Sequence, residues 1–133
     1  MMFTTKTEYG LRALAALAKN ENQRPLSVAQ IAKDNKISRP YLEQIFSLLK
    51  ADDLVTSVKG AEGGYGLARD AKKINIFEVV EALEGPLAVF YCMSSENNRV
   101  TCSSKNCLTK KVWDELQRNL IRTLRKFTLA DLI

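Results

Sequence analysis

The chain has 133 residues, of which 46% are hydrophobic and 26% are charged. A chain of this length forms one domain with a substantial core, and this composition excludes disordered and fibrous proteins. The formal net charge is +5, and basic residues outnumber acidic ones in residues 1–73 and 99–133, whereas residues 74–98 carry acidic charges only. Such a balance suits a polyanionic partner such as nucleic acid, without requiring one.

The beginning of the chain carries charges but lacks the apolar segment of a secretory signal, and no apolar run approaches the ~20 residues that span a membrane. We therefore expect a soluble, cytoplasmic protein without a membrane partner. The chain has three cysteines and no histidine. An odd number of cysteines without a signal peptide argues against a disulfide scaffold and leaves metal binding, redox chemistry or reduced thiols.

The first fifty residues predict three amphipathic helices. Capping boxes, in which two side chains three residues apart satisfy the first backbone amides of a helix, are predicted at Thr5–Glu8 and Ser27–Gln30. Ser38 can cap a third helix. Apolar residues follow each start at helical spacing, and in the third helix these are Leu42, Ile45, Phe46 and Leu49.

The hydrophobic period changes after the third helix. Leu54–Val58 and Tyr65–Ala68 favour two strands, and the glycines between them supply turn geometry. Helices followed by a glycine-rich hairpin are the order of a winged helix-turn-helix. In that fold the third helix enters the major groove of DNA, and the hairpin lies against the backbone or the minor groove. We therefore predict a mostly α fold with a small β wing.

Two more helices are predicted beyond the wing. Asn75–Glu78 is a capping box that begins a fourth helix, and Gly85 with Pro86 ends it. Apolar residues recur at helical spacing from Leu108 to Phe127. They predict a long C-terminal helix.

The face of the third helix opposite its apolar stripe is polar. It carries Arg39, Pro40, Glu43, Gln44, Ser47 and Lys50. Gln can bind adenine through two hydrogen bonds and Glu can accept from the cytosine amino group, so this face has the chemistry to read base edges. Glycines keep the hairpin slim where Lys59 and Arg69 can meet phosphates. The alternative is a solvated helix face and glycines that only satisfy the turn.

Several segments give the chain a family resemblance. They are Ser-Arg-Pro-Tyr-Leu-Glu-Gln-Ile-Phe at residues 38–46, the glycine-rich hairpin at 54–69, Ile-Phe-Glu-Val-Val-Glu-Ala-Leu-Glu-Gly at 76–85, and the opening at 5–14. Together they resemble the Rrf-two family of bacterial winged-helix transcription regulators. The likeness runs from residue 3 to the long C-terminal helix, and its Tyr-Leu-Glu-Gln-Ile-Phe and Gly-Gly-Tyr motifs are specific.

The resemblance implies a homodimer, with the long C-terminal helices packed together, that binds a pseudo-palindromic operator in double-stranded DNA. The family implies DNA contacts in the major groove from Ser38, Tyr41, Glu43 and Gln44, and in the minor groove from Lys59 and Gly60. Arg39 is expected to lie beside these contacts. Two positions depart from the family. Lys59 stands where Arg is common, and Arg suits a narrow minor groove better. Glu62 lies in a turn expected to face phosphates, where its charge costs affinity unless it points away.

These implications divide the chain into three parts. Residues 1–85 are expected to form the winged helix-turn-helix DNA-binding domain, residues 86–107 a cysteine-containing sensor loop, and residues 108–133 the dimerisation helix and tail. Because the sensor loop directly precedes the dimerisation helix, a change in the loop is expected to alter the separation of the two recognition helices and so the affinity for DNA. The predicted activity is that of a repressor.

All three cysteines, Cys92, Cys102 and Cys107, lie in the sensor loop, where some members of the family hold an iron–sulfur cluster. Thiolates are the normal ligands of such clusters. We predict one here, with the two-iron two-sulfur form favoured over the four-iron four-sulfur form. Nine residues and then four separate successive cysteines, which is wider than in most cluster-binding relatives. Without histidine the fourth ligand must be of another kind, and the resemblance points to Glu8 of the partner subunit.

Other functions stay open from the sequence. The same fold can act as a cluster-free regulator through reversible oxidation of its thiols. A small iron–sulfur electron-transfer protein is less favoured, because it leaves the polar face around Glu43 and Gln44 without a purpose. An enzyme is not expected, since the chain lacks histidine and shows no nucleophile–base pair or paired acidic motif.

Overall fold

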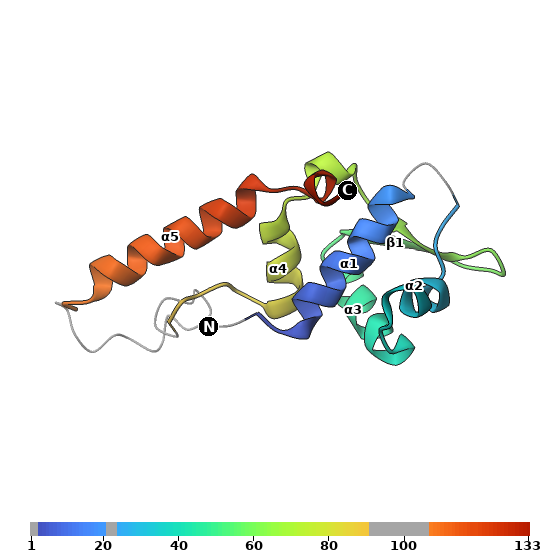
Figure 1. Cartoon of the computed structure of the whole chain (residues 1–133), viewed down its shortest axis with the longest axis horizontal. Helices are drawn as coiled ribbons and strands as arrows, with labels where there is room; N and C mark the ends of the chain where they lie inside the picture. The colour runs from blue at the N-terminus through green and yellow to red at the C-terminus, as the bar shows by residue number, and fades with distance from the viewer. Residues whose placement is uncertain (1–2, 21–23, 91–106) are drawn as a thin grey trace.

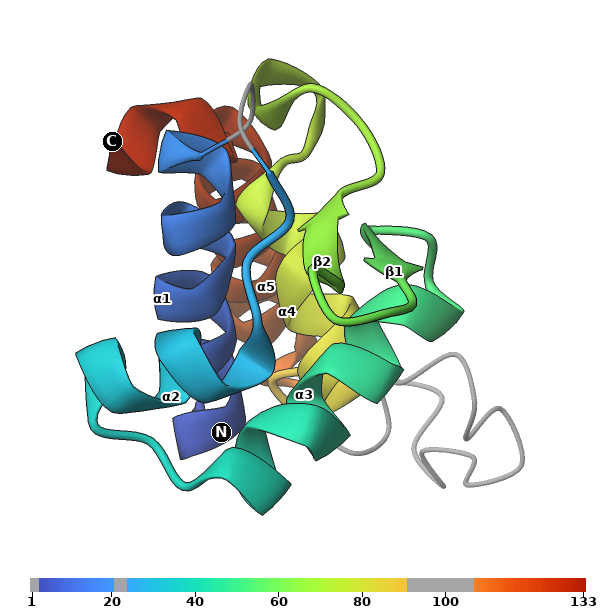
Figure 2. The same ribbon diagram turned by 90° about the vertical axis from the view of Figure 1, so that its right-hand side faces the viewer.

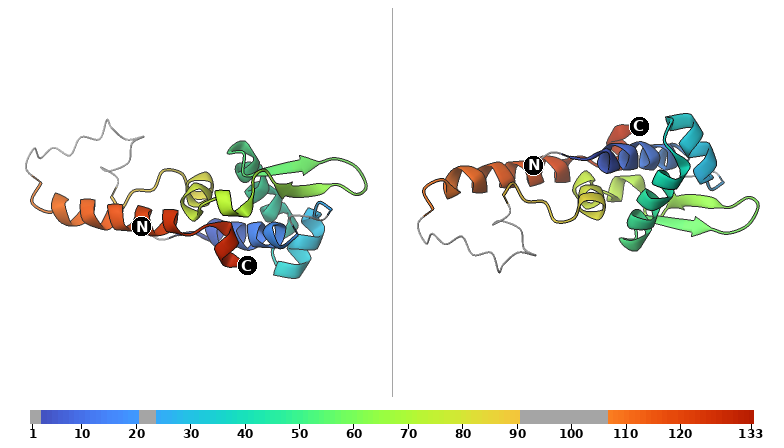
Figure 3. Two further views of the ribbon diagram at one scale, coloured as in Figure 1. Left: turned by 90° about the horizontal axis from the view of Figure 1, so that it is seen from above. Right: turned by 90° about the horizontal axis from the view of Figure 1, so that it is seen from below.

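The computed structural model describes residues 3–20, 24–90 and 107–133. The elements in chain order are α1 (Thr5–Lys19), α2 (Val28–Asn35), α3 (Arg39–Ala51), β1 (Val55–Val58), β2 (Gly64–Leu67), the 3-10 helix η1 (Ala71–Lys73), α4 (Ile76–Glu84), α5 (Lys110–Lys126) and the 3-10 helix η4 (Leu129–Leu132). The molecule is elongated, with α5 projecting at one end and the hairpin at the other (Figures 1 and 3). The predicted winged helix-turn-helix with a long C-terminal helix is confirmed.

The beginning of α1 differs from the sequence prediction. Thr4, not Thr5, is the N-cap, and its hydroxyl accepts a hydrogen bond from the amide of Lys6. The backbone amide of Thr4 donates to Glu84, at the end of α4, over 2.8 Å. The capping box predicted at Thr5–Glu8 is therefore wrong, because the N-cap lies one residue earlier and its amide donates to a distant carboxylate. Glu8 instead pairs with Arg12 one turn later, at 2.8 Å.

The remaining helix starts follow local rules more closely. Ser27 caps α2 and Ser38 caps α3, as predicted. The capping box predicted at Ser27–Gln30 is not reciprocal, because the Gln30 side chain donates to Asp34 at 2.8 Å. Asn75–Glu78 forms the full box, with both hydrogen bonds at 3.0 Å, and α4 ends before Gly85 as predicted.

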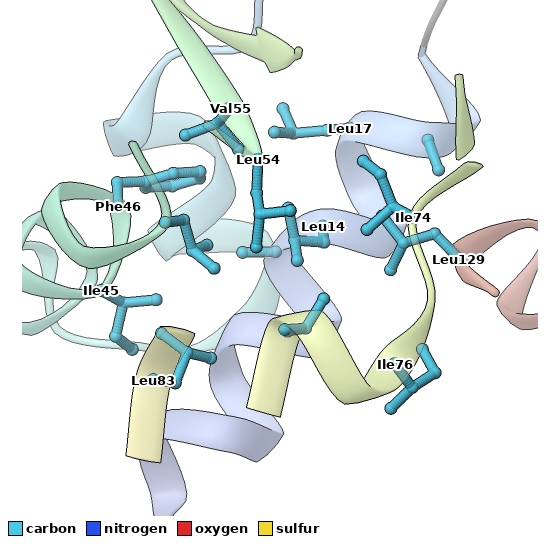
Figure 4. Packing of buried hydrophobic residues seen from close by; sticks show 14 of the residues in the cluster. Leu14, Leu17, Ile45, Phe46, Leu54, Val55, Ile74, Ile76, Leu83 and Leu129 are labelled. Carbon is cyan, nitrogen blue, oxygen red and sulfur yellow. The ribbon is translucent and has the colours of Figure 1, made fainter. Parts of the chain in front are cut away.

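One hydrophobic core joins the winged unit to residues much later in the chain. Figure 4 shows Leu14, Leu17, Ile45, Phe46, Leu54, Val55, Ile74, Ile76, Leu83 and Leu129 packed together. Fully burying one such side chain contributes about 1.5–3 kcal/mol. These contacts hold α1, α3, α4 and the wing in fixed relative positions.

The wing is an antiparallel hairpin in which Val55 pairs with Leu67 and Val58 with Gly64. The first strand begins one residue later than predicted, because the amide of Leu54 still donates to the carbonyl of Leu49 in α3 at 3.0 Å, and the second strand is Gly64–Leu67 instead of Tyr65–Ala68. A third segment joins the wing: Leu26 and Tyr65 exchange backbone hydrogen bonds of 3.1 and 2.8 Å. The close approach of Leu26 explains the glycine at 64, because a Cβ there would overlap the Leu26 carbonyl.

The C-terminal helix α5 is joined to the rest of the molecule after its last turn and also along its length, where Gln117 accepts from the amide of Val89 at 3.1 Å and Trp113 packs edge-on against Phe90. After α5, backbone hydrogen bonds join Ile76 to Phe127 and Leu129 to Ile74, and Leu129 is fully buried. None of residues 110–126 is buried, and the apolar residues near the beginning of α5 are exposed. Within the described residues, no helix is long and apolar enough to cross a bilayer.

Candidate nucleic-acid interface

Helix α3 lies beside the wing on one side of the molecule (Figure 2). Ser38 is exposed and its hydroxyl accepts from the amide of Tyr41 at 3.3 Å, which fixes where the helix begins. Glu43 and Gln44 are exposed on the following turn. The buried stripe of α3 faces the core, so these predicted base-reading side chains all point outward.

The exposed side chains of α3 differ in their hydrogen bonding. Arg39 and Glu43 form a long ion pair of 3.4 Å, with both side chains more than half exposed. An exposed ion pair of this kind contributes little to the stability of the fold, so the side chain of either partner is available to contact DNA. Among the described residues, the side-chain amide of Gln44 has no hydrogen-bond partner. Its amide can therefore meet a base edge without breaking a contact.

Tyr41 is more constrained than the sequence predicts. Its ring is half-buried against Tyr9 in an edge-on contact with centroids 5.9 Å apart. Its hydroxyl shares a hydrogen bond of 2.9 Å with the hydroxyl of Thr5. Tyr41 therefore fixes the beginning of α3 against the beginning of α1, whatever it contacts on DNA.

The wing and α3 form one rigid unit. The rings of Phe46 and Tyr65 are stacked, with centroids 4.3 Å apart and planes 8° from parallel. The ammonium group of Lys50 donates to the hydroxyl of Ser57 in β1 at 2.7 Å. These contacts were not foreseen from the sequence, because each joins residues of two different elements, and no local spacing rule links them even where, as for Lys50 and Ser57, they are seven positions apart. They fix the angle at which helix and wing would meet a duplex.

The wing tip carries the predicted minor-groove residues. Lys59 and Gly60 are exposed, and Gly60 has a positive φ of 109°, which favours glycine. Glu62 does not stand alone at the tip, because it forms an ion pair of 3.0 Å with Arg24. Arg69, in contrast, lies away from the tip. It binds Glu78 and the carbonyl of Lys73, both at 3.1 Å, and its place beside phosphates stays a prediction.

The end of α4 binds the beginning of α1 close to the Tyr41 contact. One carboxylate oxygen of Glu84 accepts from the Thr4 hydroxyl at 2.6 Å and from the Thr7 hydroxyl at 2.7 Å, besides the Thr4 amide. Partial burial raises the pKa of Glu84, but these hydrogen bonds and the nearby charge of Lys6 outweigh it. The pKa of Glu84 is consequently below its ordinary value.

The predicted metal ligands are only partly within the described residues. Cys92 and Cys102 lie outside them. Cys107 is half-buried just before α5, with its sulfur 3.5 Å from the hydroxyl of Thr109. Glu8 is exposed on α1 and paired with Arg12. The described residues bring together no group of three or more His, Cys, Asp or Glu side chains that could hold a metal ion.

A capped helix with an outward polar face, joined rigidly to a slim glycine-tipped hairpin, defines a winged-helix DNA-binding protein. The Rrf2 family model, described as an iron-dependent transcriptional regulator, matches residues 3–133. The chain belongs to the Rrf2 (Rrf-two) family of DNA-binding transcriptional regulators. The predictions of a transcription regulator, and not an enzyme, are confirmed by this membership.

Individual relatives agree with the family. Protein rrf2 of Nitratidesulfovibrio vulgaris is 38% identical over 133 residues, covering all of this chain and 87% of that protein. The structure of CymR (YrzC), the global cysteine regulator of B. subtilis, is similar with a TM-score of 0.85 and 30% identity, over 99% of this chain and 95% of that one. IscR of T. potens is similar with a TM-score of 0.80 and 33% identity, over 99% and 85%.

Proposed function

We propose that the chain is a repressor that binds a pseudo-palindromic operator as a homodimer. The observation that carries this proposal is the rigid coupling of α3 to the wing through the Lys50–Ser57 hydrogen bond and the Phe46–Tyr65 stack. Such coupling serves a surface that meets a duplex in one orientation. The net charge of +5 favours the approach to DNA.

The proposed contacts divide between reading bases and holding the backbone. Gln44 is assigned to an adenine edge and Glu43 to a cytosine amino group, with Arg39 able to bind guanine or phosphate. The remaining proposed contacts are Ser38 and Tyr41 at the beginning of α3 and Lys59 and Gly60 in the minor groove. Replacing Gln44 should change base preference at one position, whereas replacing Lys59 should weaken binding to all sequences alike.

The exposed apolar residues of α5 support the proposed dimer. Val112 is 60% exposed and Leu116 is 48% exposed. Nearby, Phe3, Val89, Phe90, Trp113, Leu116 and Leu120 line an open pocket of about 410 Å³. We assign this surface, within the proposed dimerisation part at residues 108–133, to a second copy of the chain. The two recognition helices of the dimer would then sit roughly 34 Å apart, in successive major grooves.

The proposed control lies in residues 86–107, between the DNA-binding domain at residues 1–85 and α5. Cys92, Cys102 and Cys107 are a suitable donor set for an iron–sulfur cluster because thiolates are its preferred ligands, and the two-iron form remains our favoured assignment. Glu8 of the partner subunit is proposed as the fourth ligand; its exposure on α1 leaves it accessible. When bound, the cluster would supply a labile, oxidant-sensitive group.

A second candidate is a cluster-free regulator that responds to thiol oxidation. The structural likeness to CymR, named a global cysteine regulator, favours it. In that case Cys107 and another thiol would form a reversible disulfide. The protein would be colourless, and its DNA affinity would depend on the thiol redox state alone.

Protein prepared without oxygen separates the two candidates. Bound iron and visible absorbance support the cluster, whereas a colourless protein with a reversible disulfide supports the thiol regulator. Cys102→Ala should change operator affinity while the dimer stays intact, and Ser103→Ala, which alters the neighbouring residue, should not. An operator affinity that is the same with and without iron, and with and without reductant, would exclude both forms of control.

DNA binding itself is tested by titration of labelled duplexes. A randomised pool should yield a sequence with two-fold symmetry, and the affinity should fall by about three decades or more between 50 and 200 mM salt if six or more phosphates are contacted. A protein that selects no sequence would contradict the proposed function, whatever its iron content.

A further inference from the structure

The ion pair between Arg24 and Glu62 joins the segment before α2 to the wing tip. The guanidinium of Arg24 lies 3.0 Å from the carboxylate of Glu62, and the two side chains are 81% and 75% exposed. The residues are 38 positions apart in the chain. Exposed pairs of this kind contribute little or no measurable stability. Folding alone therefore does not explain why these two charges are placed together.

The backbone of Arg24 is held at the edge of the wing. Its carbonyl accepts a hydrogen bond of 2.6 Å from the side chain of Asn20, at the end of α1. Pro25 follows, and a residue before proline is restricted to extended conformations. One position further, Leu26 exchanges two backbone hydrogen bonds with Tyr65 of β2. Arg24 is therefore positioned beside the wing, with only its side chain free to move.

Glu62 lies at the tip itself. The amide of Gly63 donates to the carbonyl of Gly60 at 3.0 Å, so Glu62 is inside a tight turn. Figures 1 and 3 show this hairpin extending beyond the rest of the molecule. A carboxylate at this position would face the phosphates of any duplex that the wing meets. Lys59, at the same tip, is the opposite charge that DNA binding requires.

We propose that Arg24 is a phosphate-binding residue of the wing, held by Glu62 in the free protein and transferred to a DNA phosphate on binding. Arginine forms strong paired hydrogen bonds with phosphate, and an exposed pair with a carboxylate is easily exchanged for them. Before DNA arrives, Glu62 holds the guanidinium of Arg24 beside the wing tip. Its carboxylate also opposes the transfer of that guanidinium to a DNA phosphate. The pair of Arg24 and Glu62 sets how tightly the wing binds the phosphate backbone of DNA. Contacts with that backbone carry no sequence information.

This inference rests on the proposed DNA-binding function, so its test begins with wild-type protein. The probe is a fluorescent duplex that wild-type protein selects from a randomised pool, and the affinity is measured from 50 to 200 mM salt. Glu62→Gln frees Arg24. It should strengthen binding by up to about five-fold at 150 mM salt for each wing that contacts DNA, because the guanidinium no longer leaves a carboxylate to reach the phosphate. The salt dependence should stay close to that of wild type, because Arg24 contacts the phosphate in both complexes.

Two comparisons identify Arg24 as the residue responsible. Arg24→Gln should weaken binding and reduce the salt dependence. In the double variant Arg24→Gln with Glu62→Gln, the gain from Glu62→Gln should largely disappear. Glu81→Gln on α4 is the matched control, because it removes the same charge from an exposed position away from the wing. It should leave the affinity within about two-fold of wild type.

The outcomes are separable. If wild-type protein selects no duplex, the DNA-binding proposal itself fails. If wild-type protein binds but Glu62→Gln strengthens binding equally with and without Arg24, Glu62 only repels phosphate and the role of Arg24 is overturned. An equal gain from Glu81→Gln would assign the effect to net charge and also overturn the proposal. Circular dichroism of each variant checks that the winged unit is folded.

Discussion

Replacing Glu84 by Gln tests the junction that completes the beginning of α1. In the wild-type chain one carboxylate oxygen accepts three hydrogen bonds, over 2.8 and 2.6 Å from Thr4 and 2.7 Å from Thr7. Gln keeps an acceptor of similar size but removes the charge. A hydrogen bond to a charged group contributes about 1.5–3 kcal/mol and one to a neutral group about 0.5–1.5 kcal/mol.

The losses in free energy at the three hydrogen bonds do not simply add when Gln replaces Glu84. Thr4 is exposed and exchanges its bonds with water readily, whereas Thr7 is only 7% exposed and has no such replacement. The lost interaction of an anion with the beginning of a helix is worth about 0.3–1 kcal/mol more. We therefore expect Glu84→Gln to lower the free energy of unfolding by about 1–2 kcal/mol near neutral pH.

The effect should depend on pH in one direction. Burial raises the pKa of Glu84, but the hydrogen bonds from Thr4 and Thr7 and the charge of Lys6 lower it further, to below the ordinary value of 4.5. A group whose pKa is lower in the folded state contributes stability that is complete above its unfolded pKa and is lost as the pH falls through the folded pKa. Gln does not titrate. The difference between the two chains should therefore shrink below about pH 4.5.

Urea unfolding followed by circular dichroism measures this difference near neutral pH and at about pH 3, with Glu81→Gln as the control. Glu81 is exposed one turn earlier on α4, and among the described residues its side chain has no partner. The control should lie within about 0.5 kcal/mol of wild type. The reasoning is refuted if Glu84→Gln matches the control near neutral pH, or if its loss of stability is the same at both pH values.

Three further predictions concern the wing, its link to α3 and the core. Gly64→Ala should destabilise the fold by more than about 2 kcal/mol, because the new Cβ overlaps a facing carbonyl, whereas Gly66→Ala has open space and should cost less than about 1 kcal/mol in urea unfolding. Lys50→Met should reduce operator affinity in anisotropy titrations, because it removes the hydrogen bond that couples α3 to the wing, and should change the free energy of unfolding by less than about 1.5 kcal/mol; an unchanged affinity would contradict the role of this coupling. Leu129→Ala should lower the free energy of unfolding by about 2–5 kcal/mol, whereas Leu132→Ala, at an exposed position, should lower it by less than about 1 kcal/mol. Equal losses in the two variants would contradict the assigned role of Leu129 in the core.

Sequence patterns predicted those features whose partners are close in the chain. Ser38 and Asn75 were identified as caps because each bonds an amide three residues later. The stripe of α3 was identified because its residues repeat at helical spacing. The glycine-rich wing was identified because turn residues constrain their own backbone, which is also a local signal.

Features that depend on distant partners were missed. Thr5–Glu8 has the pattern of a capping box, but Thr4 is the N-cap and its amide donates to Glu84. Arg69 flanks the hairpin, and the sequence did not predict its pairing with Glu78 of α4. No local signal linked Arg24 to the wing. In each case the deciding hydrogen bond or ion pair joins two different elements or segments of the fold, with partners from nine to 80 positions apart in the chain.

The hydrogen bonds from Thr4 and Thr7 to Glu84 also bear on how the protein is made. The residues that begin α1 leave the ribosome early, but the carboxylate that completes the helix follows 80 positions after Thr4. At about 5–20 residues per second, α1 waits on the order of 4–16 seconds for it. During that interval the beginning of the helix has its local hydrogen bonds but not the carboxylate of Glu84. The junction between α1 and α4 is therefore completed only after α4 has been synthesised.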